Sequence, residues 1–197
     1  MTSGRLPRSF AFAATLFVAG AAHAAGQEAR LTFDQLMATL AQVSTSHARY
    51  REVKHVSMLK EPLNLSGTLF YARPDRMEKR QTRPFAEVIR VEGDRLTVER
   101  DGRTRSVSLR GAPLVDALVE SLRATLAGDA ASLESLYEAR VEGAPDRWTL
   151  LLTPRDPEVA AAVRSIAVAG SGARLARIEI VEPGGDSSVM TIEDESP

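Results

Sequence analysis

The chain has 197 residues, with 25 lysines and arginines against 26 aspartates and glutamates, a formal net charge of −1 and no cysteine. This balance excludes the basic surplus that is typical of nucleic-acid-binding proteins. The lack of cysteine excludes a disulfide framework, a thiolate metal site, a cysteine nucleophile and a lipid-modified cysteine.

The first 24 residues predict a cleavable secretory signal peptide. Arg5 and Arg8 supply a basic start, residues 10–22 are almost all apolar or small, and Ala22-His23-Ala24 fits the small-x-small cleavage rule. The apolar run is too short to span a bilayer as a helix, and an uncleaved anchor is the alternative that we weigh against cleavage. We therefore expect a mature, lipid-free protein in the periplasm of a Gram-negative cell, with one domain over residues 25–197 and a net charge of −3.

The first expected element of that domain is an amphipathic helix from Thr32 to Val43. Thr32 and Gln35 have the spacing of a capping box, and Leu31 and Leu36 have that of a hydrophobic staple. One apolar stripe follows at steps of three and four residues: Phe33, Leu36, Met37, Leu40 and Val43.

From Ala48 onward the apolar period changes to two, which predicts strands. The clearest strand has one apolar face, and Pro74 ends it: Leu63, Leu65, Gly67, Leu69 and Tyr71. Arg73 has the same parity as this set, so an arginine closes the apolar face where the strand stops. Further strands are expected over residues 85–91, 95–100 and 103–109, and Asp101-Gly102 indicates a hairpin turn.

A second helix is expected from Pro113 to the stop signal at Gly128, with leucines at steps of four: Leu114, Leu118, Leu122 and Leu126. A short helical turn over residues 129–136 and strands over 137–142, 147–153, 163–169, 173–181 and 187–192 complete the pattern. The expected fold class is mainly β with helices: an antiparallel sheet curled over a core, with helices on one side.

Catalytic motifs are missing from the sequence. There is no G-x-S-x-G, H-E-x-x-H or P-loop pattern, and Gly170-Ser171-Gly172 has the context of a turn. Outside the signal peptide the histidines are His47 and His55, and neither has a partner at metal-ligand spacing. We expect a binding protein, with no catalytic residue, no metal site and no cofactor.

Three segments of the chain carry a family resemblance. Leu40-x-x-Val43-Ser44-x-x-His47-Ala48-x-Tyr50 and Gly67-x-Leu69-x-Tyr71-Ala72-Arg73-Pro74-x-x-Met77 resemble the helix-to-strand start and the Arg-Pro strand end of LolA, the periplasmic carrier of outer-membrane lipoproteins. Leu151-Leu152-Thr153-Pro154-Arg155 is similar to that family's L-T-P-K/R segment. The order of the elements agrees over nearly all of the mature chain.

The resemblance implies a half-open, unclosed antiparallel β-barrel covered by an α-helical lid. It implies a monomer whose cavity shields the acyl chains of lipoproteins, received from an inner-membrane ABC transporter and passed to an outer-membrane acceptor lipoprotein, LolB. The family's gating role falls on Arg73, for which a plain strand-end arginine is the alternative. The implied cavity and lid residues, for which ordinary core packing is the alternative, are Leu36, Leu40, Tyr50, Leu69, Tyr71, Met77, Leu118 and Leu122.

Two positions depart from the family pattern. Met77 stands where the family has a phenylalanine, and Lys79, on the same face, replaces an aromatic residue. These departures bear on the cargo more than on the fold. They leave open a carrier of a non-protein lipid or polyene ester for a dedicated export pathway, and a periplasmic sensor or adaptor that uses the same fold to bind a partner protein.

Overall fold

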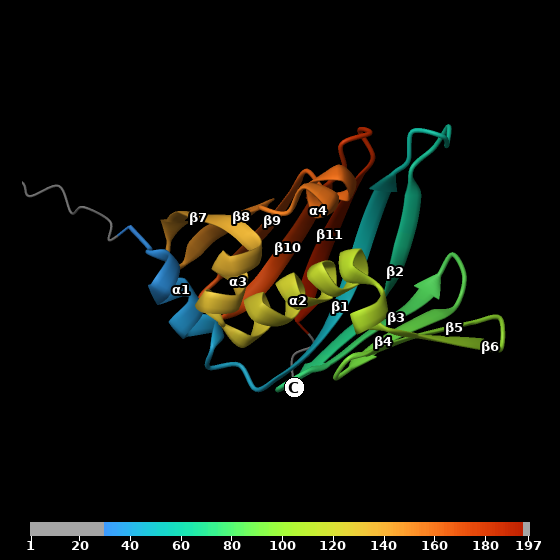
Figure 1. Cartoon of the computed structure of the whole chain (residues 1–197), viewed down its shortest axis with the longest axis horizontal. Coiled ribbons are helices and arrows are strands. Elements are labelled where there is room, and N and C mark those ends of the chain that lie inside the picture. The colour runs from blue at the N-terminus through green and yellow to red at the C-terminus, as the bar shows by residue number, and fades with distance from the viewer. Residues whose placement is uncertain (1–29, 195–197) are drawn as a thin grey trace, which may run out of the picture.

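One antiparallel sheet of 11 strands dominates the computed structural model of the chain, which describes residues 30–194 (Figure 1). The expected signal peptide, residues 1–24, lies outside the described residues. The strand order is β6-β5-β4-β3-β2-β1-β11-β10-β9-β8-β7, so the two edge strands β6 and β7 follow each other in the chain. The sheet is therefore unclosed between β6 and β7, as the resemblance implies.

A run of six strands follows the first helix, and the remaining helices stand before and within the second run of strands. The helices are α1 Phe33–Leu40, α2 Pro113–Ala127, α3 Ala130–Leu136 and α4 Pro157–Ala162, with a 3-10 turn η1 Leu109–Gly111. The strands are β1 Thr45–His55, β2 Leu63–Ala72, β3 Arg76–Arg83, β4 Glu87–Glu92, β5 Arg95–Arg100, β6 Arg103–Ser108, β7 Tyr137–Ala144, β8 Arg147–Pro154, β9 Ser165–Ser171, β10 Arg174–Val181 and β11 Ser187–Asp194.

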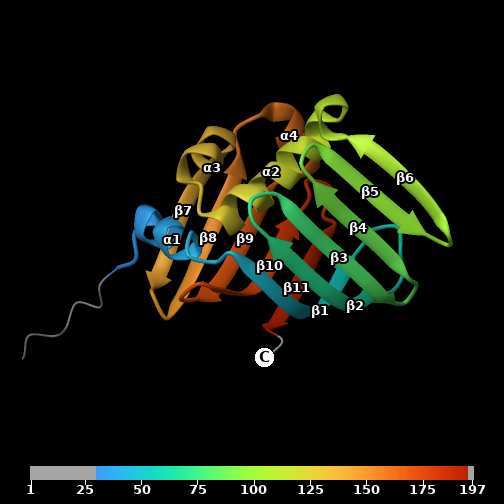
Figure 2. The ribbon, with the colours of Figure 1, turned by 90° about the horizontal axis from the view of Figure 1, so that it is seen from below.

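The sheet consists of two meanders that meet at β1. Strands β1–β6 form one meander and β7–β11 the other, and β1 pairs with both β2 and β11. Helices α2 and α3 carry the chain across the concave side, from the edge at β6 to the opposite edge at β7 (Figure 2). The helical cover is thus also the connection between the two free edges.

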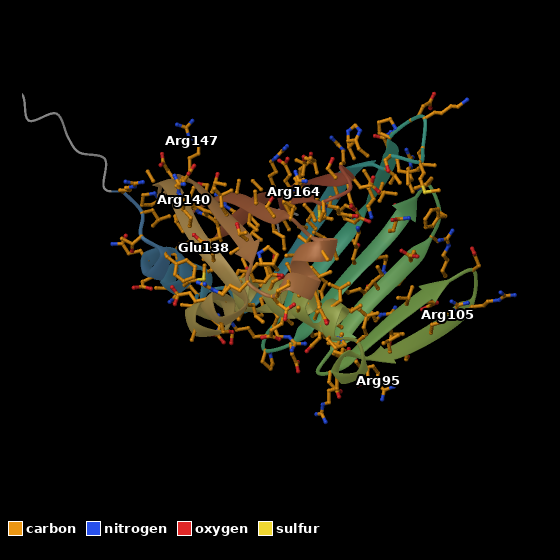
Figure 3. The ribbon with its side chains drawn as sticks, turned by 45° about the horizontal axis from the view of Figure 1, so that its top comes forward. Arg95, Arg105, Glu138, Arg140, Arg147 and Arg164 are labelled. Carbon is orange, nitrogen blue, oxygen red and sulfur yellow. The ribbon has the colours of Figure 1, made fainter. Side chains whose placement is uncertain are left out.

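Strand register separates an inner face, toward the helices, from an outer face. Across β2, β3, β4 and β5 the inner residues pair in one row: Tyr71 with Met77, Met77 with Val91, and Val91 with Leu96. Successive side chains of a strand point to opposite faces. The outer residues are mostly polar, and Arg140 and Arg147 project away from the helices (Figure 3).

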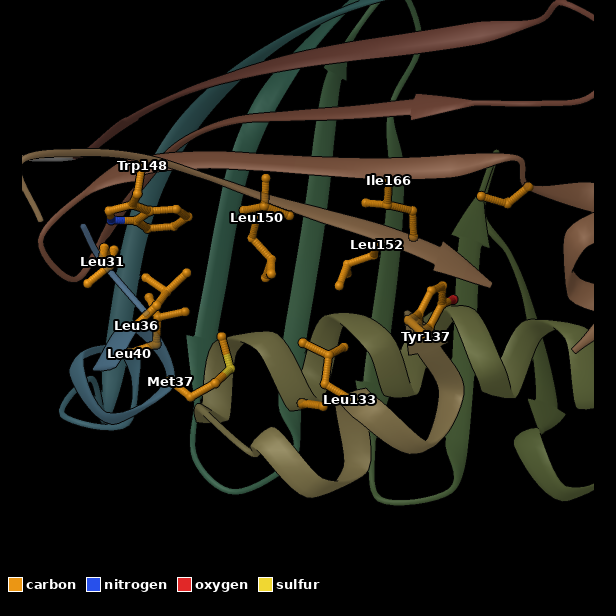
Figure 4. Close-up of a cluster of buried hydrophobic side chains, with 13 residues drawn as sticks. Leu31, Leu36, Met37, Leu40, Leu133, Tyr137, Trp148, Leu150, Leu152 and Ile166 are labelled. Atoms are coloured by element: carbon orange, nitrogen blue, oxygen red, sulfur yellow. The ribbon is translucent and has the colours of Figure 1, made fainter. Parts of the chain in front are cut away.

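Two separate clusters of buried side chains lie on the inner face. The large cluster joins β7–β10 to α1, α2 and α3, and Figure 4 shows Trp148, Leu150 and Leu152 pointing from β8 toward Met37 and Leu133 of the helices. The small cluster lies on the other meander and consists of Tyr71, Met77, Val91 and Leu109, with Val43, Leu96, Val119 and Leu126 packed against it.

Local signals in the sequence account for the helix ends. Thr32 and Gln35 form the expected capping box of α1. Pro113 begins α2, and Gly128, with a φ of 66°, caps its C-terminal end in the left-handed region that favours glycine. The capping expectations for both helices are confirmed.

Two elements were missed by the sequence-based expectation, which is wrong at these places. Strand β3 carries five charged residues among its eight, and Met77 is its one apolar side chain, so the alternating pattern is hidden. Helix α4 has only six residues, too few to show a helical period, although Asp156 accepts hydrogen bonds from the backbone nitrogens of Glu158 and Val159 as an N-cap should.

Candidate binding face

A strip of apolar side chains between the two clusters remains only partly covered. Tyr50 of β1 pairs with Ile192 on one side and Gly67 on the other, which places the neighbouring inner residues of β2 and β11 beside it. These neighbours are partly exposed, in contrast to the large cluster. We call the following set the open strip: Leu65 and Leu69 of β2, Met190 and Ile192 of β11, and Val115 and Leu122 of α2.

The orientation of α2 brings two aliphatic side chains to the open strip. Leu118 packs against the large cluster, whereas Val119 and Leu126 pack against the small one. With 3.6 residues per turn, Val115 and Leu122 point between these two directions, toward the middle of the sheet. They are 37% and 38% exposed, so the helix lies over the strip without burying it.

Arg73 fastens the far end of α2 to the start of β1. Its Nε donates a hydrogen bond to the carbonyl oxygen of Val43 at 2.9 Å, and its Nη2 donates to that of Ala127 at 2.7 Å. Ala127 is the last residue of α2, whose carbonyl has no partner within the helix. A guanidinium also complements the negative end of the helix dipole there. One side chain at the end of β2 therefore contacts both the end of α2 and the α1–β1 connection.

The residues expected to line a cavity fall into three environments. Leu36 and Leu40 are 0% and 1% exposed inside the large cluster, and Leu118 packs against it. Tyr71 and Met77 belong to the small cluster. Only Tyr50, Leu69 and Leu122 lie at the open strip, and of these Tyr50 is 2% exposed. The structure thus brings together part of the expected set.

A polar group interrupts the apolar inner face. The Nζ of Lys79 lies 2.5 Å from Oε2 of Glu52, and the hydroxyl of Ser188 donates to Oε1 of Glu52 at 2.6 Å. Burial alone would raise the pKa of Glu52, but the hydrogen bonds from Lys79 and Ser188 and the positive charge of Lys79 lower it. Glu52 is therefore held as a charged carboxylate on the inner face, next to the apolar side chains of the open strip.

The tyrosines on this face are buried with incomplete hydrogen bonding. The hydroxyls of Tyr50 and Tyr71 have no hydrogen-bond partner among the described residues. Burial raises the pKa of Tyr50, and the charges of Glu52 and Glu87 raise it further. Burial also raises the pKa of Tyr71, against the opposing charge of Arg73. Both side chains remain neutral phenols.

Two hollows lie elsewhere on the surface. One of about 240 Å³ is at the β1–β2 loop, where the side chain of Met58 is 92% exposed. Another of about 250 Å³ lies between α2, α3 and α4 and includes Leu114 and Tyr137. Neither contains a residue that the sequence indicated as ligand-binding.

The sequence analysis missed most of the polar group, and of the open strip it named only Leu69 and Leu122 as candidate binding residues. Val115, Met190 and Ile192 stand in segments with a clear period, but their partial exposure depends on the gap between two clusters. Glu52 and Lys79 are far apart in sequence, and only the strand register shows that they meet. The sequence did offer one signal for the polar group: Lys79 stands two residues after Met77, so it puts a charge on the same face of the strand.

Residues 30–194 contain no group of three or more histidine, cysteine, aspartate or glutamate side chains that could hold a metal ion. Within the same range no helix has the length and apolar content needed to cross a membrane. What the described residues offer is a curved sheet with partly covered apolar side chains and a helical cover, which is the geometry of a binding protein.

Comparison with known proteins identifies the class. A family model described as outer membrane lipoprotein carrier protein LolA-like matches residues 24–192, and the chain belongs to this family. It is similar to a protein of Methylibium petroleiphilum named outer-membrane lipoprotein carrier protein, with 31% identity over 180 residues, 89% of this chain and 81% of the relative.

Solved structures of related shape were also found. One is a LolA superfamily protein from Nitrosomonas europaea, with a TM-score of 0.44 and 13% identity, covering 85% of this chain and 96% of that one. Another is the lipoprotein LppX of Mycobacterium tuberculosis, with a TM-score of 0.43 and 16% identity, covering 82% and 96%.

Proposed function

We propose that this protein is a periplasmic carrier that holds the acyl chains of a lipoprotein against the open strip and moves them from the inner to the outer membrane. The observation that carries the proposal is the open strip itself, where Val115 and Leu122 of α2 face the middle of the sheet but stay more than a third exposed. Membership of the LolA-like family supports the same reading.

The energetic problem of such a carrier is the exposure of apolar surface. Each methylene removed from water is worth about 0.8 kcal/mol, so an acyl chain does not cross the periplasm alone. An empty carrier must cover its own apolar surface to stay soluble. Helix α2 rests on both clusters through Leu118 and Val119, and so covers the strip in part while leaving a place where a chain can enter.

Arg73 supplies a closing contact in this scheme. Its hydrogen bonds to Val43 and Ala127 hold the α1–β1 connection and the end of α2 in the closed arrangement. Bound cargo competes with this arrangement, because a chain under α2 must displace the helix outward. Weak closing contacts make the two states comparable in free energy, which is what loading and release both require.

The first test is mass spectrometry of whatever co-purifies with the protein from its native periplasm. A triacylated lipoprotein supports the proposal. A free lipid or a polyene ester would replace it with a carrier for a dedicated export pathway, and a stoichiometric unlipidated protein partner would replace it with an adaptor. The same experiment gives the mass of the mature protein, which we expect to begin at Ala25.

A matched pair of variants locates the binding face. Leu122 and Leu114 belong to the same helix and are 38% and 39% exposed, but only Leu122 points toward the open strip. We expect Leu122→Asn to weaken binding of the apolar dye N-phenyl-1-naphthylamine about tenfold, and Leu114→Asn to leave it unchanged. Equal effects of the two substitutions would contradict a binding face at the open strip.

Transfer is the last part of the proposal. We expect an inner-membrane ABC transporter as donor and an outer-membrane lipoprotein as acceptor, and no catalytic step by the carrier itself. Incubation of the cargo-loaded protein with outer-membrane vesicles should move the cargo to the vesicles without chemical change. Cargo recovered with a cleaved or new covalent bond would show that the protein is an enzyme.

A further inference from the structure

The ion pair between Lys79 and Glu52 stands on the face that is proposed to hold hydrocarbon. Glu52 is 6% exposed, and its two carboxylate oxygens accept from Lys79 and Ser188. A buried ion pair is often no more stabilising than apolar side chains of the same volume, because both ions lose their hydration. The stability of the fold therefore does not explain why an ion pair, and not a pair of apolar side chains, occupies this place.

The sheet places the pair at the centre of the inner face. Glu52 pairs with Leu65 of β2, and Lys79 of β3 pairs with Leu69 of the same strand. Between them lies Gly67, which pairs with Tyr50 and Gln81 and has no side chain to fill the space. The Lys79 side chain can thus cross β2, pass over the ring of Tyr50 at 4.9 Å and reach Glu52.

This group has hydrogen-bonding capacity to spare. An ammonium has three donors, and the Lys79 side chain, 27% exposed, uses one of them on Glu52. The Tyr50 hydroxyl is almost fully buried and has no partner among residues 30–194. Buried polar groups normally have partners, so an unpartnered hydroxyl beside an underused ammonium indicates a place for a ligand's polar atom.

The charges around the group favour a neutral ligand. Glu52 and Glu87 both lie near the Tyr50 hydroxyl, and their negative charges act on it. Lys79 pairs with Glu52, on which the charge of Lys54 also acts, and Arg100, with Nη1 3.9 Å from Oε2 of Glu87, pairs with the other carboxylate. A free anion would meet two carboxylates, and a cation would compete with Lys79. A neutral hydrogen-bond acceptor meets neither penalty.

We propose that Lys79, held by Glu52 over Tyr50, binds the carbonyl oxygen of an acyl ester or amide, so that this carrier selects acylated cargo over plain hydrocarbon. The inference rests on the proposed function and adds a polar anchor to its apolar face. The carbonyl accepts from Lys79, while the chain lies along the flanking leucines Leu65 and Leu69.

Displacement of N-phenyl-1-naphthylamine from the full mature protein tests the anchor. The competitors are three lauroyl compounds and an alkane of similar length: methyl laurate, N-methyllauramide, laurate and tridecane. We expect the ester and the amide to bind about tenfold tighter than tridecane, since a hydrogen bond from a charged donor is worth at least this factor. Laurate, with a free carboxylate, should bind more weakly than its methyl ester at pH 8.

Two double variants separate the anchor from general effects on the sheet. Glu52→Gln/Lys79→Met removes both charges together and should reduce the preference for ester over alkane to less than about threefold. Glu78→Gln/Arg90→Met removes an ion pair of 2.7 Å from the outer face of β3 and β4, and should keep the tenfold preference. Lys79→Arg retains a cationic donor and should also keep it.

The possible outcomes distinguish the proposed carbonyl-binding role of Lys79 from the proposed carrier function. Equal binding of ester and alkane by the unmodified protein would overturn the anchor and leave the carrier proposal intact, as would a preference that survives Glu52→Gln/Lys79→Met. Tighter binding of laurate than of its ester would show an anion site in place of a carbonyl site. Failure of the dye and all competitors to bind would overturn both proposals.

Discussion

The two meanders of the sheet have the same strand topology but differ in how their inner faces are filled. Strands β7–β10 pack Trp148, Leu150 and Leu152 against three helices, and these side chains are at most 1% exposed. Strands β2–β6 pack against α2 and η1 with a small cluster, and Val107 on β6 is 45% exposed. Strands β7–β10 and the helices thus form a closed core. Strands β2–β6 have a more open inner face, and we call these strands the open wall.

This difference shows how one sheet combines stability with an accessible apolar face. A protein that left its whole inner face open would lose the burial that stabilises the fold. Concentrating the helices over β7–β10 gives a core that does not depend on cargo. Strands β2–β6 are held through their pairing with β1 and bury only the small cluster, so Leu65 and Leu69 of β2 stay partly exposed. In the proposed carrier, binding and folding therefore depend on different parts of the same inner face.

The largest expected effect is on core packing. Leu150→Ala removes a side chain that is 0% exposed, and we expect the free energy of unfolding in urea to fall by about 3 kcal/mol. Leu69→Ala, on the partly exposed inner face of β2, should lower it by about 1 kcal/mol. Equal losses for the two variants would remove the distinction between a closed core and an open wall.

Gly128 tests the junction of the helical cover with the closed core. Its φ is +66°, and a Cβ there would lie 2.2 Å from the carbonyl oxygen of Met37 in α1. Gly128→Ala should destabilise the protein by about 2–3 kcal/mol, from backbone strain and from displacement of α1. Gly172, with a φ of +55° and no neighbour within 4 Å, is the matched control, and Gly172→Ala should cost about 1 kcal/mol in thermal unfolding.

The sequence predicts the closed core better than the open wall. Periodicity identifies Leu36, Leu40, Leu150 and Leu152 as apolar and inward-facing, and the structure buries all four. It does not tell a core leucine from a binding leucine, because both face inward; Leu36 and Leu40 were expected at the cavity but lie in the core. That distinction depends on where the helices lie, which is a long-range property.

The open wall is harder to predict because charged residues interrupt the alternating apolar pattern by which strands are recognised. Strand β3 was missed since Arg76, Glu78 and Arg80 occupy its outer positions and Lys79 interrupts the inner ones. Arg73, in contrast, could be placed from the sequence, because parity and the following proline locate it at a strand end. Its hydrogen bonds to Val43 and Ala127 agree with that location, while its gating role stays a prediction.

Arg73→Leu probes whether the wall and the helical cover exchange between closed and open states. Loss of the hydrogen bonds to Val43 and Ala127 destabilises the closed state, so the open state gains population and cargo binds more tightly. We expect the affinity for N-phenyl-1-naphthylamine to rise about tenfold and transfer of loaded cargo to outer-membrane vesicles to slow.

Arg76 provides the control for that variant. It is an exposed arginine at the start of β3 that pairs with Glu92 at 3.2 Å and lies over the ring of Phe70, on the outer face. Arg76→Leu should leave dye affinity and transfer unchanged. Normal transfer by Arg73→Leu would leave Arg73 as a structural contact at a strand end without a part in release.

The smallest expected effect is the pH dependence that Glu52 confers on the wall. Its pKa is lowered in the folded protein, so its contribution to stability is complete above the ordinary pKa of a glutamate and is lost as the pH falls through the lowered value. Protonation also leaves the partly buried ammonium of Lys79 without its partner carboxylate. In urea unfolding measured between pH 3 and 7, Glu52→Gln should therefore flatten the acid side of the stability profile.

The control is Glu193→Gln. The Glu193 carboxylate lies 3.5 Å from Arg51 on the exposed outer face, and its removal should leave the shape of the stability profile unchanged. A profile for Glu52→Gln that is parallel to that of the unmodified protein would mean that the carboxylate is not held charged by Lys79, and the polar anchor would lose its basis.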